Sequence, residues 1–331
     1  MILVTGGTGF LGKSVVRLLA QNDNNLIRCF VRYGTPDNVF ADIENGKNIE
    51  IFKGSFNSIS DLKESLKGVD CVIHLAASLV GGVPAQIANT VTGTENLLDA
   101  CESSKISRFV LCSSLGVLKT NNIERNKILD ESTPIEDSPE KRDPYTHAKI
   151  IQEQIAWQKY KNNKLPLVII RPGVIFGPPV NILSSRIGLS IMGVFLHLGR
   201  GNILPLTFKD NCADAIIKAA FVENIEGEVF HITDDNLPTS RQLLKRYKKE
   251  VKSIKSVYIP YLVLKFIGSL NEWYSKKYNN HFPPVFTDYK VSSIWKGHKY
   301  SNKKAKQLLV WNPPVSMEKG LDQTFNYIKN N

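Results

Sequence analysis

The sequence predicts an α/β fold, a doubly wound parallel sheet with a smaller C-terminal cap. Apolar strand patterns alternate with helical patterns through the first half of the chain, as they do in βαβ units. The expected strands are apolar on both faces, which indicates a parallel sheet covered by helices on either side. The first strand also runs directly into three glycines, Gly6, Gly9 and Gly12, spaced three residues apart. That arrangement is typical of a Rossmann turn.

The strands and helices of this sheet follow one another in strict order. They are expected at 2–5 (strand), 14–20 (helix), 26–31 (strand), 49–52 (strand), 59–66 (helix), 71–77 (strand), 84–102 (helix), 109–114 (strand), from 145 (helix) and 167–172 (strand). Beyond them, 210–222 has a helical pattern and 228–233 a strand pattern. We therefore expect a dinucleotide-binding domain over 1–178, to which 206–235 returns. A substrate-binding cap is expected over 179–205 and 236–331.

One segment of the cap, from Ile259 to Trp273, is strongly apolar but short and interrupted by Lys265. It is too short to span a membrane, so it is either a buried cap helix or an interfacial helix. Burial in the core is the favoured interpretation.

Composition and charge limit the classes of protein. The chain has 331 residues, 42% hydrophobic and 22% charged, which is ordinary for a soluble globular protein. It has no leader pattern and no run of about 18 uncharged apolar residues, so we expect a cytoplasmic protein. The five cysteines and six histidines are scattered without ligand spacing, which predicts reduced thiols and no metal site.

The net charge of +11 comes largely from lysines late in the chain. A lysine-rich solvated surface is the first interpretation of this excess. Steering of an anionic cofactor or substrate and contact with an anionic membrane surface are the alternatives, with peripheral membrane contact not favoured. Nucleic acid is not expected as a partner, because no recognition motif accompanies the charge.

The three glycines have distinct roles in a dinucleotide cradle. Gly6 permits the tight strand-to-helix turn, Gly9 lets the backbone approach a pyrophosphate, and Gly12 lets the helix lie against the sheet. The phosphates then meet the N–H groups of a helix N-terminus.

Arg32 follows the second strand, where an NAD-binding protein usually places a carboxylate for the ribose hydroxyls. Residues 29–33 contain no acid. A guanidinium can instead bind a 2′-phosphate through its fork of N–H donors, so NADP(H) is favoured over NAD(H) as the cofactor.

Tyr145 and Lys149 stand four residues apart, one turn along the same face of a helix. A neighbouring ammonium, together with an oxidised nicotinamide, is expected to lower the tyrosine pKa and favour proton transfer. Ser114 ends a parallel strand at the sheet edge where such folds bind ligands. Ser114, Tyr145 and Lys149 together are therefore the predicted catalytic set.

At this point the sequence resembles the extended short-chain dehydrogenase/reductases over essentially its whole length. The matching segments are Thr5 to Gly12, Val72 to Ala77, Gly93 to Leu98, Cys112 to Ser114, Tyr145 to Lys149 and Arg171 to Pro178. The tail from Tyr300 to Leu321 is closest to the branch of 3β-hydroxysteroid dehydrogenases and dihydroflavonol-4-reductase-like enzymes. Two positions depart from the family pattern: Ser55 replaces an acidic residue, and Thr90 an asparagine.

The resemblance implies roles for particular residues. Tyr145 would be the acid/base, Lys149 would bind the nicotinamide ribose and tune Tyr145, and Ser114 would orient the substrate oxygen. The other implied cofactor contacts are Phe10 and Leu11 in the glycine motif, Leu75, Ala76 and Ala77 beside the adenosine and pyrophosphate, and Pro172 and Val174 at the nicotinamide. A homodimer is also implied, joined through a four-helix bundle of the 84–102 and Tyr145 helices.

The leading prediction is an NADP-dependent oxidoreductase that interconverts a ketone and a secondary alcohol on a fairly apolar small molecule, such as a steroid-, fatty- or polyketide-like compound. Its expected pocket walls are Leu79, Val80, Leu115, Val117 and the stretch 179–197. The alternative is a nucleotide-sugar epimerase, dehydratase or reductase, whose basic cap would hold a diphosphate. A nonenzymatic NADP sensor is a third hypothesis, disfavoured because a sensor needs no proton donor.

Overall fold

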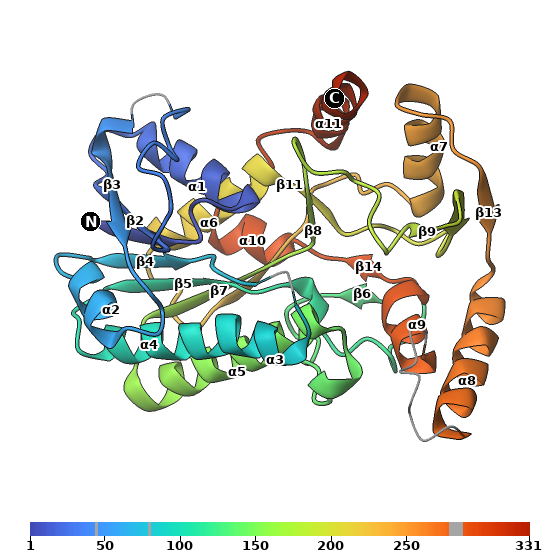
Figure 1. Cartoon of the computed structure of the whole chain (residues 1–331), viewed down its shortest axis with the longest axis horizontal. Helices are drawn as coiled ribbons and strands as arrows, with labels where there is room; N and C mark the ends of the chain where they lie inside the picture. Colours follow the sequence, from blue (N-terminus) through green and yellow to red (C-terminus); the bar gives the residue numbers. More distant parts are fainter. Residues whose placement is uncertain (44–45, 79–80, 278–286) are drawn as a thin grey trace.

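The computed structural model describes residues 1–43, 46–78, 81–277 and 287–331. Its centre is a parallel seven-stranded sheet in the order β12-β7-β5-β4-β1-β2-β3 (Figure 1). In chain order these strands are β1 (Ile2–Thr5), β2 (Ile27–Val31), β3 (Ile49–Lys53), β4 (Cys71–His74), β5 (Arg108–Cys112), β7 (Leu167–Pro172) and β12 (Val229–Ile232). The strand order reverses beside β1, so the carboxyl ends of β1 and β4 flank the crevice where such sheets bind ligands.

Helices cover both faces of the sheet, as the doubly apolar strands predict. One face carries α1 (Phe10–Ala20), α6 (Lys209–Phe221) and α10 (Lys303–Leu308). The other carries α2 (Ile59–Ser65), α4 (Gly93–Glu102) and α5 (Pro144–Asn163), which lie together below the sheet in Figure 1. The sheet thus separates two apolar clusters, and the predicted α/β class is confirmed.

The helix expected over 84–102 is continuous in path but irregular in geometry. It begins as α3 (Val83–Gln86), passes through a π-helical segment, η2 (Ile87–Thr92), and ends as α4. Such π segments are frequent at functional sites. Here the segment carries Thr90, whose hydroxyl accepts the backbone N–H of Ser78 at 2.9 Å.

The C-terminal cap is built from short strands and peripheral helices. Apart from β6 (Ile128–Leu129), β8 (Val174–Phe176) and β11 (Leu206–Phe208), which are short strands outside the expected cap ranges, its strands are β9 (Gly188–Ile191), β10 (Val194–His197), β13 (Ser256–Tyr258) and β14 (Lys299–Tyr300). Its helices are α7 (Ser240–Glu250), α8 (Tyr261–Lys277), α9 (Asp288–Trp295) and α11 (Met317–Asn330). Short 3₁₀ turns complete the chain: η1 (Gly46–Asn48), η3 (Leu115–Val117) and η4 (Pro139–Lys141). The division into two domains stays a prediction.

The favoured burial of the 259–273 segment is wrong. Helix α8 packs against α9 through a narrow inner stripe that includes buried Leu264. Its outer side is exposed, with Leu262 and Phe266 at 75% and 64%. The high mean apolarity of the segment favours burial, but the described residues cover α8 on the side that faces α9 and leave its outer side exposed. Within the described residues, no helix is long and apolar enough to cross a membrane.

The expected dimer helices α4 and α5 lie side by side on the outside of the sheet (Figure 1). Lys159 on α5 pairs with Asp99 and Glu102 on α4, at 2.5 Å in both cases. On α5, Ile151 and Ile155 are half-buried. Dimerisation through this face stays a prediction.

Candidate active site

The glycine turn after β1 is packed so closely that side chains are excluded. Gly6 has φ +72, in the left-handed region, and an added Cβ would lie 2.7 Å from the backbone nitrogen of Ala76. A Cβ on Gly12 would lie 2.0 Å from the carbonyl oxygen of Gly6. The turn, the first helix and the end of β4 are therefore pressed together at backbone contact distance, as the spacing of the glycines predicts.

The N-terminus of α1 is left open toward this turn. Gly9 is the N-cap, and no side chain among the described residues caps the first N–H groups of the helix. Phe10 and Leu11 form the first helical positions and are half-buried. An open helix N-terminus beside a turn that only glycine can occupy fits a pyrophosphate. These residues therefore fit a dinucleotide.

The backbone after β4 runs along the same crevice. The N–H of Leu75 donates to the carbonyl oxygen of Thr5 at 3.1 Å, and Ala76 lies against Gly6. Leu75, Ala76 and Ala77 are all half-buried. The structure thus brings these three predicted cofactor residues to the glycine turn.

Arg32 is exposed at the carboxyl end of β2, and its guanidinium makes no ion pair within the part of the chain that the structure describes. Its neighbour Tyr33 donates to Asp61 at 2.8 Å. The Asp61 carboxylate also accepts the backbone N–H of Ser55, and this bond leads the effects that lower its pKa. An acid from α2 therefore reaches the position at which Ser55 replaces the acidic residue usual in the family.

Ser114, Tyr145 and Lys149 converge at the carboxyl end of β5. Lys149 Nζ donates to the carbonyl oxygen of Cys112, the last residue of that strand, at 2.7 Å. Ser114 follows two residues later and its hydroxyl accepts the backbone N–H of Gly116 at 3.0 Å. Tyr145 lies close enough to Ser114 for hydrogen bonding between the two side chains to lower the pKa of the phenol. Asp143 caps α5 and Pro144 is its first residue, which places Tyr145 in the first turn of the helix.

The expected lowering of the Tyr145 pKa is not found. Burial raises the pKa of Tyr145 well above its ordinary value, with smaller contributions from Cys112 and Asp143, and hydrogen bonding with Ser114 opposes the rise. The Lys149 ammonium is directed toward Cys112 and Gln152 instead. A neutral phenol is the form that donates a proton, so this environment keeps Tyr145 ready to act as an acid.

A buried hydrogen-bond network, which the sequence did not reveal, extends from Lys149 to the glycine turn. Gln152 accepts from Lys149 Nζ at 2.7 Å and donates to Thr94 Oγ1 at 2.6 Å. His74 bridges Thr94 Oγ1 at 2.8 Å and Thr5 Oγ1 at 2.7 Å. The network therefore joins the end of β1 to the middle of α5.

Counting donors and acceptors assigns the protons in this network. The Thr94 hydroxyl donates to the carbonyl oxygen of Thr90 at 2.6 Å, so its oxygen is an acceptor toward both Gln152 and His74. His74 is then neutral with its proton on Nε2, and Nδ1 accepts from Thr5. Burial is the first cause that lowers the pKa of His74 to about 3, which agrees with a neutral ring.

One turn beyond Lys149, a buried ion pair fixes α5 to the sheet. Arg171 Nε donates to both carboxylate oxygens of Glu153 at 3.1 and 3.2 Å, and Ser113 donates to the same carboxylate. Both charged side chains are buried. Two features of the sequence could have indicated this pair: Arg171 is a charged residue on an apolar strand, and Glu153 is a charged residue four positions after Lys149. Ser113 thus has a structural role, and Ser114 remains available for substrate.

Pro172 and Val174 lie at the entrance to the cap. Pro172 ends β7, and the N–H of Val174 donates to the carbonyl oxygen of Pro205 at 2.6 Å.

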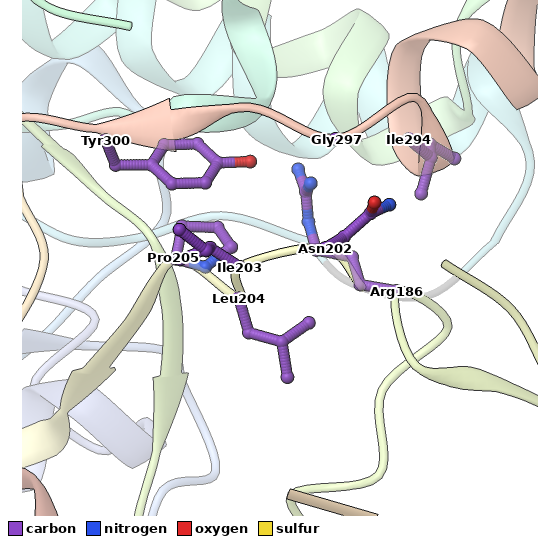
Figure 2. A pocket seen from close by; sticks show the side chains of 8 residues that line it. All are labelled: Arg186, Asn202, Ile203, Leu204, Pro205, Ile294, Gly297 and Tyr300. Atoms are coloured by element: carbon purple, nitrogen blue, oxygen red, sulfur yellow. The ribbon is translucent and has the colours of Figure 1, made fainter. Parts of the chain in front are cut away.

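Pro205 also lines a cavity of about 10 Å³, which Figure 2 shows with Arg186, Asn202 and other side chains around it. The Tyr300 hydroxyl points toward the Arg186 guanidinium (Figure 2). Burial raises the pKa of Tyr300, while Arg186 opposes the rise.

The predicted pocket walls divide into three groups. Leu115 and Val117 are buried in an apolar cluster with Ile150. Leu79 and Val80 lie outside the described residues. The stretch 179–197 supplies eight of the twelve residues around an outer cap cavity of about 490 Å³, which are Asn181, Leu183, Ser185, Gly188, Leu189, Ser190, Gly193 and Phe195.

No group of three or more metal-ligating side chains is found among the residues that the structure describes. The five cysteines are buried and free of disulfides. The polar groups that converge at the end of β5 are thus a hydroxyl, a phenol and an ammonium, which suit proton transfer beside a bound dinucleotide.

Comparisons with known proteins agree with this geometry. A profile of the 3-beta hydroxysteroid dehydrogenase/isomerase family matches residues 3–256. The decarboxylating sterol-4-alpha-carboxylate 3-dehydrogenase of Candida albicans is 29% identical over 350 residues, with 99% of this chain and 97% of the relative covered. The human enzyme of the same name is 28% identical over 345 residues, covering 97% of this chain and 86% of its own.

Solved structures share the fold. UDP-glucuronic acid 4-epimerase from Bacillus cereus, in complex with UDP-glucuronic acid and NAD, has a TM-score of 0.74 at 21% identity, with 99% of each chain covered. The family profile spans the glycine turn, Ser114, and the Tyr145–Lys149 pair, and the resemblance seen in the sequence is confirmed. The chain belongs to the 3-beta hydroxysteroid dehydrogenase/isomerase family and is an NAD(P)-dependent oxidoreductase of the extended short-chain dehydrogenase/reductase type.

Proposed function

We propose that the protein interconverts a secondary alcohol and a ketone on a sterol-like molecule, with Tyr145 as the acid/base and NADP(H) as the preferred cofactor. The observation that carries the proposal is the convergence of Ser114, Tyr145 and Lys149 at the end of β5, beside the glycine turn. The names of the relatives support a sterol substrate that is oxidised at C3.

Bound NADP(H) would accept a hydride in the oxidation and supply one in the reduction. In the reduction, Tyr145 donates the phenolic proton to the carbonyl oxygen as that oxygen gains charge. Ser114 donates a hydrogen bond to the same oxygen and stabilises the developing negative charge. In the oxidation, the Tyr145 phenolate takes up the proton of the alcohol and becomes the neutral phenol.

Lys149 supports this transfer through its remaining donor. An ammonium has three N–H donors. Two of them bond to Cys112 and Gln152. The third is available for a ribose hydroxyl of the cofactor. Burial lowers the pKa of Lys149, and the nearby Cys112 and Glu153 oppose this lowering.

The preference for NADP(H) rests on Arg32. Its guanidinium is exposed at the carboxyl end of β2 and makes no ion pair within the described residues. It is therefore free to bind a 2′-phosphate. The Asp61 carboxylate accepts hydrogen bonds from the backbone N–H of Ser55 and from the Tyr33 hydroxyl, so its charge is already bound by donors from the protein.

Substrate oxidation by the purified protein tests the proposal. A 3β-hydroxysteroid and a sterol 4α-carboxylic acid are each offered with NADP⁺ or NAD⁺, and formation of reduced nicotinamide and of the ketone is measured. We expect ketone formation with at least one of the two, faster with NADP⁺. Conversion of UDP-glucose or UDP-glucuronic acid with neither sterol oxidised would instead establish the nucleotide-sugar alternative.

A further inference from the structure

The cap contains a cavity of about 490 Å³, which we call the outer cap cavity. Its volume lies within the range of small-molecule sites, about 300–1,000 Å³. The described residues that line it come from 181–195, which includes the β9–β10 hairpin, and from 247–255, which joins the end of α7 to β13. Figure 1 shows α7, β9 and β13 at the end of the cap away from the central sheet. The fold therefore holds a space of ligand size outside the dinucleotide crevice.

This cavity is separate from the catalytic centre. None of its described lining residues belongs to the glycine turn, to the set of Ser114, Tyr145 and Lys149, or to the small cavity of Figure 2. The two cavities share one wall segment, since Arg186 lines the small cavity and its neighbour Ser185 lines the outer one. A molecule in the outer cap cavity is therefore a second ligand.

One part of the cavity wall is apolar. It is formed by Leu183, Leu189, Phe195 and Ile254, and we call it the apolar wall. Phe195 is buried in an apolar cluster of the cap, and Leu183 and Ile254 pack against that cluster. Burial of apolar ligand surface against such a wall is favourable by about 25 cal/mol per Å². The apolar wall therefore favours a ligand with an apolar body.

Tyr247 brings a hydroxyl to the same cavity. Its side chain is only 6% exposed, and its ring lies edge to face with Phe325, with the centroids 6.0 Å apart. The hydroxyl makes no hydrogen bond within the described residues. Because a phenol buried to this extent usually bonds to an acceptor, an acceptor on the ligand would complete its environment.

Two lysines supply the charge at the cavity. Lys252 and Lys255 are exposed lining residues, and neither ammonium makes an ion pair within the described residues. Their backbones are fixed: the N–H of Lys252 donates to the carbonyl oxygen of Tyr247 at 3.2 Å, and the carbonyl oxygen of Lys255 accepts the N–H of Phe195 at 2.9 Å. Two unpaired cations beside an apolar wall attract an amphiphilic anion.

The kind of anion follows from the neighbouring helix. Helix α7 ends at Glu250, so its last carbonyl groups, which carry partial negative charge, lie beside Tyr247 and Lys252. That charge opposes a doubly charged phosphate more strongly than a carboxylate. No arginine is among the described lining residues, so the bidentate contact typical of phosphate sites is absent there. A single carboxylate fits this environment best.

We propose that the outer cap cavity binds an amphiphilic carboxylate, with its apolar body on the apolar wall and its carboxylate at Lys252, Lys255 and Tyr247. Two sources share this chemistry, a fatty acid and a steroid acid, which differ in the shape of the apolar body. The proposal does not rest on the proposed activity.

Calorimetric titration of the full chain with decanoate tests the proposal, with cholate as the steroid acid and 1-decanol as the uncharged control. We expect decanoate to bind at least about tenfold more tightly than 1-decanol. Lys252→Gln with Lys255→Gln should weaken decanoate binding by about tenfold, since each exposed charge pair contributes up to about fivefold. Lys161→Gln with Lys164→Gln changes two exposed lysines of the same spacing at the end of α5 and should leave it unchanged.

A matched pair of substitutions on β9 locates the bound acid. Neighbouring residues of a strand point to opposite faces, and Ser190 lines the cavity whereas the exposed Ile191 is not among its described lining residues. Ser190→Trp places an indole in the cavity and should abolish decanoate binding, while Ile191→Trp should leave it unchanged. Tyr247→Phe should weaken it by about fivefold or more. The NADPH affinity of each variant verifies that it is folded.

Binding of neither decanoate nor cholate by the unmodified protein would overturn the proposal. So would equal affinities for decanoate and 1-decanol, or an equal loss of binding in the two tryptophan variants. Tyr145→Phe should bind decanoate as the unmodified protein does, and weaker binding there would place the acid at the catalytic centre instead of the cap. If both acids bind, the tighter one identifies the shape of the apolar body.

Discussion

Replacing Gly12 with alanine should separate the first helix from the glycine turn and weaken cofactor binding. The new Cβ would lie 2.0 Å from the Gly6 carbonyl oxygen and 2.7 Å from Gly7 Cα. Because real Cβ contacts are essentially never shorter than 3.0 Å, the two backbone segments must move apart by about 1 Å, from 2.0 to at least 3.0 Å. Both atoms belong to backbone, so no side-chain rotation relieves the clash.

Two quantities change as a result. Overpacking of this kind costs about 1–3 kcal/mol of folding free energy. A displacement of about 1 Å also takes the N–H groups of α1 out of hydrogen-bond range of a bound pyrophosphate. Each charge-assisted bond that is lost costs about 1.5–3 kcal/mol, so the Kd for NADPH should rise at least about tenfold. Fluorescence titration with NADPH measures the affinity, and thermal unfolding measures the stability.

Gly46→Ala is the matched control for this change. A Cβ there would meet Ile49 Cδ1 at 3.6 Å and the Phe40 carbonyl oxygen at 3.9 Å, which are ordinary contacts. Its NADPH affinity should equal that of the unmodified protein, with stability within about 0.5 kcal/mol. If Gly12→Ala also bound NADPH with unchanged affinity, the glycine turn would not be the cofactor cradle.

Three further predictions follow from the cofactor contact and the buried groups. Arg32→Ala should remove most of the preference for NADPH over NADH, and equal affinities of the unmodified protein in calorimetric titration would refute the role of Arg32. Gln152→Leu removes one of the two protein acceptors of Lys149 and should lower kcat/KM by about tenfold or more. Gln152→Glu should restore part of the lost kcat/KM, and a rate unaffected by Gln152→Leu would exclude this positioning role. Burial lowers the pKa of His74 and His231 to about 3 and of His197 to about 4. The unfolded chain therefore binds more protons below pH about 6.5, and stability should fall as the pH drops from there, by about 1.4 kcal/mol per pH unit for each histidine. Urea unfolding at neutral and mildly acidic pH measures that slope, and a flat profile would contradict it.

The parts of the site that are encoded locally could be predicted from the sequence. The glycine turn depends on residues within one strand–helix unit, so the spacing of Gly6, Gly9 and Gly12 suffices to place it. Tyr145 and Lys149 share a helical face for the same reason. Parallel strands all end at one sheet edge, which is why Ser114 and Ala76 could be assigned to the crevice before any contact was known.

Contacts between distant segments could not be predicted in this way. Gln152 and Thr94 are 58 residues apart, and Thr5 and His74 are 69 apart, yet they belong to one network. No period or motif connects their hydroxyl, amide and imidazole groups. The predicted burial of α8 failed for a related reason, since an apolar pattern does not reveal how many other segments the tertiary structure packs against a helix.

The central claim is that Tyr145 transfers the proton while the cofactor is held by other groups. The direct measurement compares Tyr145→Phe with the unmodified protein in sterol turnover and in NADPH affinity. Removing one hydroxyl keeps the ring and leaves Lys149 bonded to Cys112 and Gln152. We expect a fall in kcat of about 10²–10⁴-fold with NADPH affinity nearly unchanged. Near-normal turnover by Tyr145→Phe would contradict it and leave Tyr145 with a structural role.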